Sequence, residues 1–263
     1  MPDQPESSGH ALTARFARFA EYDPDETDGD TLTWYVRGRN VLVAYTEADT
    51  GAVLASGHRP GEYVVLLPET RGAVHVRAAK ETVEVPGASL AVVPPGPSEI
   101  RVDGRMPVVR LFPAQSLEEA DGASAEPEPQ LDGDLTDRSS IRCHDLSRPP
   151  ELGSTIRLWR SPTLLVACPD PARGPVDPAS VVPRHYPDAE RYALVLRGEF
   201  VHRVRQPGVA GDPVEEEQER CGAPSLAIIP PKLVNSSQAV GPGLNEMVEV
   251  YCPPPAGGPY EPD

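Results

Sequence analysis

The chain has 263 residues, including 33 prolines and 22 glycines, and its 40 Asp and Glu against 24 Lys and Arg give a formal net charge of −16. Such a charge repels a phosphate backbone and argues against a nucleic-acid-binding protein. Proline at this abundance disfavours long helices and coiled coils, so many short strands joined by Pro/Gly turns are expected.

The first series of expected strands reads GEYVVLLP, GAVHVRA, ETVEVPG, SLAVVPP and MPVVRLFP, between residues 61 and 113. An acidic stretch with almost no large apolar side chains follows at 114–140. It cannot bury enough surface to offset its ordering entropy, which predicts a mobile linker. The second series reads ERYALVLRG, EFVHRVR, APSLAIIPP and NEMVEVYCPP, between residues 190 and 254. Short strands with Gly/Pro turns favour an antiparallel sandwich or barrel.

The two series are related by an internal repeat. ASLAVVPPG begins at residue 88 and PSLAIIPPK begins at residue 224, with Ser89 and Ser225 in matching places. LVAYTEAD at 42–49 likewise parallels LVACPDPA at 165–172. Blocks that recur in the same order indicate a duplicated structural unit.

No apolar run reaches the ~18–20 residues that cross a bilayer, and the sequence MPDQPESSGH lacks the basic and apolar regions of a secretory signal. The four cysteines are widely spaced, without a CxxC pair. We therefore expect a cytoplasmic protein with reduced thiols, and no membrane partner.

These blocks resemble the cupin superfamily in its two-domain, or bicupin, form. A cupin barrel is a small jelly roll with two signatures, Gly-x5-His-x-His-x3,4-Glu-x6-Gly and Gly-x5-Pro-x-Gly-x2-His-x3-Asn. Three His and one Glu of these signatures usually hold a divalent metal. The resemblance implies an all-β fold of two cupin-type barrels related by internal duplication.

The resemblance also implies a division into domains. We expect an N-terminal domain at 1–113, with its barrel at about 35–113. An acidic mobile linker at 114–150 leads to a C-terminal domain at 151–263, with its barrel at about 155–253 and a Pro-rich tail.

In the first copy, His58-x3-Glu62 has the spacing of the second His and the Glu of the first signature. Ser56 stands where the first His belongs, and Glu99 stands at the His of the second signature. His58, Glu62 and Glu99 could therefore form an oxygen-rich metal site.

In the second copy, His185-x4-Glu190 matches the first signature and Asn235 stands at the final His. The corresponding metal set is His185, Glu190 and Asn235. Another register, counted back from Gly198, makes His185 the first His and puts Arg191 at the Glu. The cofactor expectation is one divalent metal (Fe, Mn, Ni or Zn), or none.

Without a metal, a His beside a carboxylate in a partly dry pocket can act as a general base. Tyr192 follows Glu190 by two positions, so both share one strand face. We expect the second barrel to hold the catalytic set His185, Glu190, Tyr192 and His202. We expect substrate contacts from Phe200, Asn235 and Gln238.

The favoured hypothesis is a small-molecule enzyme that performs isomerase or cyclase chemistry in the second barrel, while the first barrel is mostly structural. The alternatives are a metal-dependent dioxygenase and a non-catalytic ligand-binding or scaffold protein. The expected partner is a small-molecule substrate, and a homodimer through remaining strand edges is possible.

Overall fold

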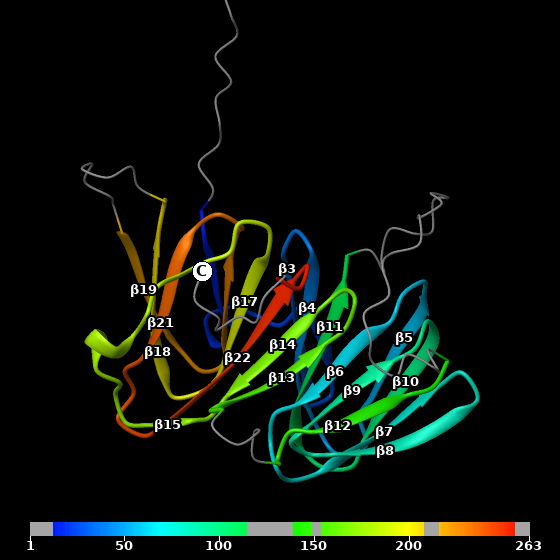
Figure 1. The fold of residues 1–263 in the computed structure, drawn as a ribbon. Coiled ribbons are helices and arrows are strands. Elements are labelled where there is room, and N and C mark those ends of the chain that lie inside the picture. Colours follow the sequence, from blue (N-terminus) through cyan, green and yellow to red (C-terminus); the bar gives the residue numbers. More distant parts are fainter. Residues whose placement is uncertain (1–12, 115–138, 149–153, 208–215, 256–263) are drawn as a thin grey trace, which may run out of the picture.

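The computed structural model describes residues 13–114, 139–148, 154–207 and 216–255, and these form two β-barrels (Figure 1). The helical elements in this part of the chain are the short 3-10 turns η1 (Phe19–Glu21) and η3 (Pro178–Ser180). None of the described residues belongs to a helix with the length and apolarity needed to cross a membrane. Most of the expected linker (115–138) and of the expected tail (256–263) lies outside the described residues.

Two antiparallel sheets form the first barrel. The seven-stranded sheet contains, in spatial order, β12 (Arg142–Asp145), β9 (Ser89–Val93), β6 (Tyr63–Leu67), β11 (Met106–Pro113), β4 (Val41–Ala48), β3 (Thr31–Arg37) and β2 (Glu26–Asp28). The four-stranded sheet contains β5 (Val53–Arg59), β10 (Gly96–Val102), β7 (Ala73–Ala78) and β8 (Glu81–Pro86).

The second barrel has the same construction. Its seven-stranded sheet contains β1 (Arg15–Arg18), β20 (Ser225–Ile229), β17 (Glu190–Arg197), β22 (Leu244–Cys252), β14 (Leu165–Pro169) and β13 (Ile156–Arg160), with β15 (Ala172–Arg173) paired to β22. Its four-stranded sheet contains β16 (Arg184–His185), β21 (Val234–Ala239), β18 (Glu199–Arg205) and β19 (Glu216–Gly222).

The strand orders of the two barrels correspond in both four-stranded sheets and across six strands of the large sheets, as expected for a duplicated unit, while β2 and β15 differ in their place. The register agrees as well, because Val65 lies opposite Ala91 in the first barrel and Ala193 lies opposite Ala227 in the second. The SLAVV and SLAII blocks therefore occupy the same place in both barrels, and the sequence repeat is a structural repeat.

Two strands cross the division between the expected domains. β1 precedes the first barrel in sequence but pairs with β20 of the second barrel, Arg15 opposite Ile228. β12 falls in the segment expected to be a mobile linker, yet it pairs with β9 of the first barrel. Each strand covers an otherwise open sheet edge. The sequence carried no signal for this exchange because both segments lie outside the repeat.

The apolar core has three parts. The interior of the first barrel is filled by side chains such as Val65, Val76 and Ile100. The interior of the second barrel carries smaller apolar clusters. The largest cluster lies between the barrels, where the outer faces of the two seven-stranded sheets pack together with residues such as Leu111 and Leu194. The central strands of the large sheets, such as β6, β9, β17 and β20, are therefore buried on both faces, and their two faces look alike in sequence.

Candidate functional site

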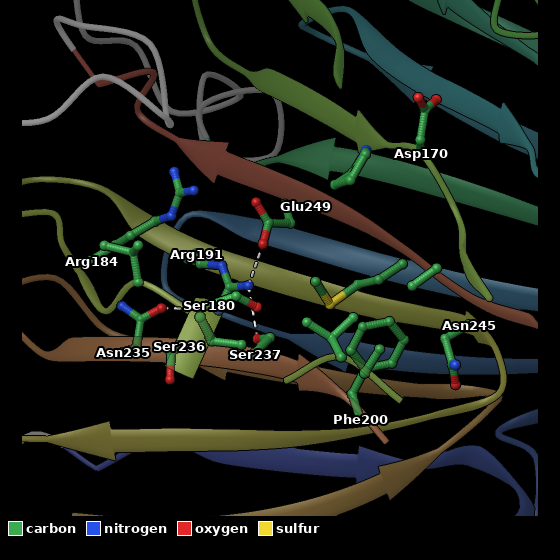
Figure 2. A pocket seen from close by; sticks show the side chains of 17 residues that line it. Asp170, Ser180, Arg184, Arg191, Phe200, Asn235, Ser236, Ser237, Asn245 and Glu249 are labelled. Carbon is green, nitrogen blue, oxygen red and sulfur yellow. Dashed lines mark hydrogen bonds and ion pairs between the residues drawn. The ribbon is translucent and has the colours of Figure 1, made fainter. Parts of the chain in front are cut away.

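The pocket of the second barrel lies inside the barrel and has a volume of about 280 Å³ (Figure 2). Strands of both sheets contribute side chains to it, and so does the segment between β15 and β16. The lining side chains used below are Arg184, Arg191, Phe200, Asn235, Met247 and Glu249. This volume is near the lower end of the ~300–1,000 Å³ usual for ligand pockets, which favours a small ligand.

Arg191 is the centre of the polar side of this pocket. Its side chain is 4% exposed, and it forms an ion pair with Glu249 on the neighbouring β22. Its Nη1 donates to Asn235 Oδ1 at 2.9 Å, and its Nη2 donates to Ser237 Oγ at 2.9 Å. The second oxygen of Glu249 accepts from the Tyr251 hydroxyl at 2.7 Å. The charge of Arg191 is therefore neutralised and its orientation fixed.

The other side of the pocket is apolar. Phe200 and Met247 line it together with Ala239 and Val176, while Val182, which is 69% exposed, stands at the rim. Asn245 closes the far end: its side chain bonds the Glu199 N–H and three backbone carbonyls. The pocket thus offers a polar wall, an apolar wall and a firmly held end.

His202 lies inside the same barrel but is not among the side chains that line the pocket, and its lowered pKa makes it a weak proton acceptor. Its residue is fully buried, its Nδ1 is 2.8 Å from Ser237 Oγ, and its ring stacks on Phe16 with centroids 6.0 Å apart. Burial, together with the nearby positive charge of Arg191, lowers the pKa of His202 to about 3, against an opposing effect of Glu249. The ring is therefore neutral, and it holds Ser237 rather than moving protons.

Glu190 and Tyr192 do share one strand face, but that face points toward the other barrel. The Tyr192 hydroxyl donates to Glu190 and accepts from the Val41 N–H at 2.8 Å. Glu190 accepts from the backbone N–H groups of Asn40 (2.9 Å) and Arg39 (3.2 Å). The expectation that this pair faces the pocket is wrong. Because β17 is buried on both faces, its pattern does not reveal which residues point inward.

The other expected residues of the second barrel are divided between the pocket and its surroundings. Phe200 and Asn235 line the pocket. Arg184 lines it too, whereas the adjacent His185 does not. Gln238 donates to the Val176 carbonyl at 2.7 Å and so holds the segment that forms the rim. The metal set His185, Glu190 and Asn235 therefore does not converge, because Glu190 faces the other barrel.

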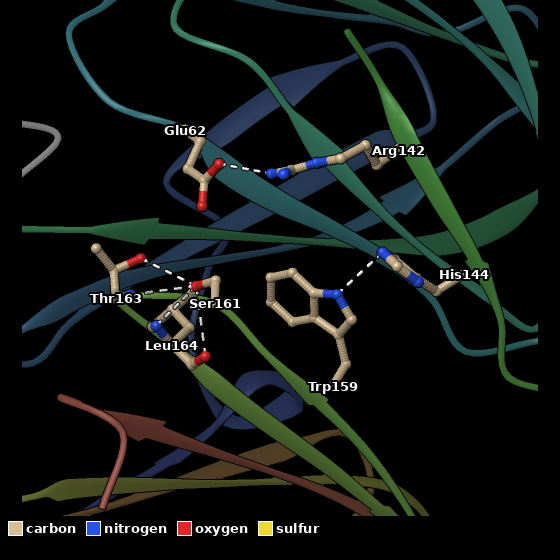
Figure 3. Close-up of polar contacts among 7 residues, drawn as sticks. All are labelled: Glu62, Arg142, His144, Trp159, Ser161, Thr163 and Leu164. Atoms are coloured by element: carbon tan, nitrogen blue, oxygen red, sulfur yellow. Dashed lines mark hydrogen bonds and ion pairs between the residues drawn. The ribbon is translucent and has the colours of Figure 1, made fainter. Parts of the chain in front are cut away.

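The metal set of the first barrel does not converge either. Glu62 accepts from Arg142 Nη2 at 2.7 Å (Figure 3), and Glu99 is ion-paired with Arg77 at 2.9 Å. A register shift between β5 and β10 pairs Gly96 with Arg59, leaving His58 exposed. Among the residues that the structure describes, no group of three or more His, Cys, Asp or Glu could hold a metal ion. The donors present do not fit the metal that the signatures imply.

No protein-family model and no curated protein matches the sequence. Solved structures do match. A Cupin 2 conserved barrel domain protein from Leptotrichia buccalis has a TM-score of 0.53 at 9% identity, over 90% of this chain and 96% of that one. Vicilin from Capsicum annuum has a TM-score of 0.63 at 15% identity, over 90% and 85%. The formate complex of Lactobacillus farciminis oxalate decarboxylase has a TM-score of 0.61 at 12% identity, over 96% and 87%.

This chain is a bicupin by fold. At such low identities the likeness establishes the architecture and not the activity. The bicupin register does identify residues that the sequence interpretation missed. Tyr63 and Arg191 occupy equivalent positions, each two residues before the matching Val65 and Ala193, and both point into their barrels. The sequence did contain one signal for Arg191: the alternative register, counted back from Gly198, places it at the Glu of the first signature.

Proposed function

We propose that this bicupin reversibly binds a small, partly polar molecule in the pocket of the second barrel, without transforming it. The observation that carries the proposal is the pocket itself, with a neutralised polar wall of Arg191, Glu249 and Asn235 opposite Phe200 and Met247. A pre-formed pocket with few oriented polar groups and an apolar wall is the usual form of a small-molecule site.

The same geometry disfavours the acid/base enzyme and the dioxygenase. Glu190 and Tyr192 bond to the backbone of the other barrel, and His202 has a pKa of about 3, so none of them is placed or tuned to move protons. Neither candidate metal set brings its donors together among the described residues. The formate complex among the comparison structures supports a small organic ligand, because a protein of this fold is seen with one.

The test is ligand-observed NMR on the full-length protein with a library of small alcohols, amides and organic acids. Ala239→Leu fills the pocket, since Ala239 lines it and is 4% exposed. Ala55→Leu is the matched control, because Ala55 is exposed on the first barrel.

We expect saturable binding of at least one compound to the wild type. It should weaken at least tenfold in Ala239→Leu and be unchanged in Ala55→Leu, with circular dichroism confirming that both variants are folded. Equal binding to a folded Ala239→Leu variant would overturn the site. Enzymatic conversion of the bound compound would overturn the non-catalytic assignment.

A further inference from the structure

The pocket of the second barrel contains a buried ion pair whose two members are both held in place. The side chains of Arg191 and Glu249 are 4% and 6% exposed, and both line the pocket. Figure 2 shows the Arg191 guanidinium between the carboxylate of Glu249 and the hydroxyl of Ser237. The other carboxylate oxygen of Glu249 accepts from the Tyr251 hydroxyl at 2.7 Å. The positive and the negative charge of the polar wall therefore stay together inside the barrel.

The other charges at the pocket are balanced as well. Its charged lining residues in the described part of the chain are Asp170, Arg184, Arg191 and Glu249, two of each sign. Asp170 is exposed and ion-paired with Arg157 at 2.8 Å, and Arg184 is partly exposed, so solvent screens both of these rim charges. The formal charges of these lining residues therefore sum to zero.

The first barrel shows that the fold does not require the buried pair. At the positions equivalent to Arg191 and Glu249, the first barrel has Tyr63 and Arg110. Tyr63 is bonded to Ser98 there, with the two hydroxyl oxygens 2.8 Å apart. The duplicated unit thus folds with different residues at these two positions. An ion pair that lines a pocket and that the barrel architecture does not require points to a role in ligand selection.

Such a pair affects charged and uncharged ligands differently. A carboxylate ligand beside Arg191 would also lie near the Glu249 carboxylate, and an ammonium group beside Glu249 would also lie near Arg191. Either ion would lose its hydration without gaining an unopposed counter-charge, which is costly in a buried site. An uncharged polar group loses much less on leaving water, and its apolar part can contact Phe200 and Met247. The pair therefore discriminates by rejecting ions.

We propose that Glu249 makes the pocket selective for uncharged polar molecules, such as amides and alcohols, over carboxylates and ammonium ions of the same shape. Glu249 is a specificity-determining residue because it balances the charge of Arg191. Without its negative charge, Arg191 would be the natural partner of a carboxylate ligand. This inference rests on the function proposed above, since it concerns the same pocket, but it makes a separate claim about the charge of the ligand.

The experiment compares benzamide, benzoate and benzylammonium, which share an aromatic ring and differ in charge. Their dissociation constants for the full-length protein are measured by ligand-observed NMR at neutral pH and constant ionic strength. For the wild type, we expect benzamide to bind at least tenfold more tightly than either charged compound. We expect Glu249→Gln to bind benzoate at least tenfold more tightly than the wild type does, because the charge of Arg191 is then no longer balanced.

Glu246→Gln is the matched control. Glu246 lies on the same strand and is paired with Arg197 at 3.7 Å, but it does not line the pocket. This variant changes the net charge of the protein as much as Glu249→Gln does, so it should keep the wild-type order of the three ligands. A gain in benzoate binding as large as that of Glu249→Gln would assign the selectivity to overall charge and would overturn the proposal.

If Glu249→Gln does not fold, Glu249→Ala takes its place, and thermal midpoints are compared in sodium acetate and sodium chloride at equal ionic strength. Acetate can supply the missing negative charge, so it should raise the midpoint of Glu249→Ala saturably and leave the wild type unchanged. The absence of this rise would contradict the assigned role of Glu249.

The outcomes separate this inference from the function on which it rests. A carboxylate or ammonium compound as the tightest wild-type ligand, with binding weakened in Ala239→Leu, would overturn the selectivity and leave the binding function standing. A folded Glu249→Gln variant without improved benzoate binding would do the same. Failure of the wild type to bind any compound, charged or uncharged, would overturn the proposed function and this inference together.

Discussion

The turn between β3 and β4 depends on a glycine that approaches the second barrel closely. A Cβ added to Gly38 would lie 2.0 Å from the Tyr192 hydroxyl oxygen and 2.5 Å from a ring carbon of Tyr192. Tyr192 is 1% exposed and cannot move aside without losing its bonds to the Val41 and Asn40 N–H groups. Gly38→Ala must therefore displace either the turn or the tyrosine.

The cost follows from these contacts. Overpacking by one methyl group typically costs about 1–3 kcal/mol, and each hydrogen bond lost adds about 1 kcal/mol. We expect Gly38→Ala to lower the free energy of unfolding by about 2–4 kcal/mol, measured by urea denaturation followed by circular dichroism. Gly104→Ala is the control, since a Cβ there meets no atom within 4 Å.

A double-mutant cycle tests the mechanism directly. Tyr192→Ala removes the ring that the new methyl group would strike, so Gly38→Ala should cost less than about 1 kcal/mol in that background. An equal cost in both backgrounds, or a Gly38→Ala variant as stable as the wild type, would refute the reasoning.

Three further predictions concern the interior of the barrels. His202 is neutral in the folded state because its pKa is lowered to about 3, whereas its ordinary value is 6.5. The unfolded chain therefore binds the extra proton first, and stability should fall as pH drops from about 6.5 toward 3, by up to about 1.4 kcal/mol per pH unit. His202→Gln should flatten this part of the curve in denaturant titrations, and an unaltered curve would contradict the assignment. Asn245→Ala should cost about 2–4 kcal/mol in urea unfolding, because it leaves the Glu199 N–H and three carbonyls without their partner. Addition of Mn²⁺ or EDTA should shift the thermal midpoint by less than about 1 °C in scanning calorimetry, because the candidate ligands do not converge. A rise of several degrees that is specific for one metal would count against that conclusion.

The sequence predicted the architecture through its repeat. The matching blocks around Ser89 and Ser225 correspond to β9 and β20, and the structure places them at the same position in the two barrels. Proline and glycine turns with short apolar runs predicted an antiparallel sandwich or barrel, and the repeat with its resemblance to cupins implied two barrels, a fold that the likeness to cupin and vicilin structures confirms.

The site was less predictable because strand faces decide it. A shift of one residue exchanges the inner and outer faces of a strand. Glu190 and Tyr192 were therefore assigned to the pocket, whereas Arg191 between them points inward. The irregular pairing at Arg59 likewise turns the His58 side chain to the exposed face of its strand. When a strand is buried on both faces, its sequence does not show which alternate residues point into the barrel. Local irregularities of strand pairing are not visible in a single sequence either.

The reciprocal pairing of β1 and β12 interlocks the two halves of the chain. A cut between residues 115 and 138 would leave an N-terminal fragment carrying a strand that completes the C-terminal barrel, and a C-terminal fragment carrying a strand that completes the N-terminal one. The N-terminal half produced alone would expose the edge of β9, and the C-terminal half the edge of β20. Such unpaired strand edges promote aggregation. The two gene halves therefore cannot be shuffled independently, and a nicked protein should stay associated until it is denatured.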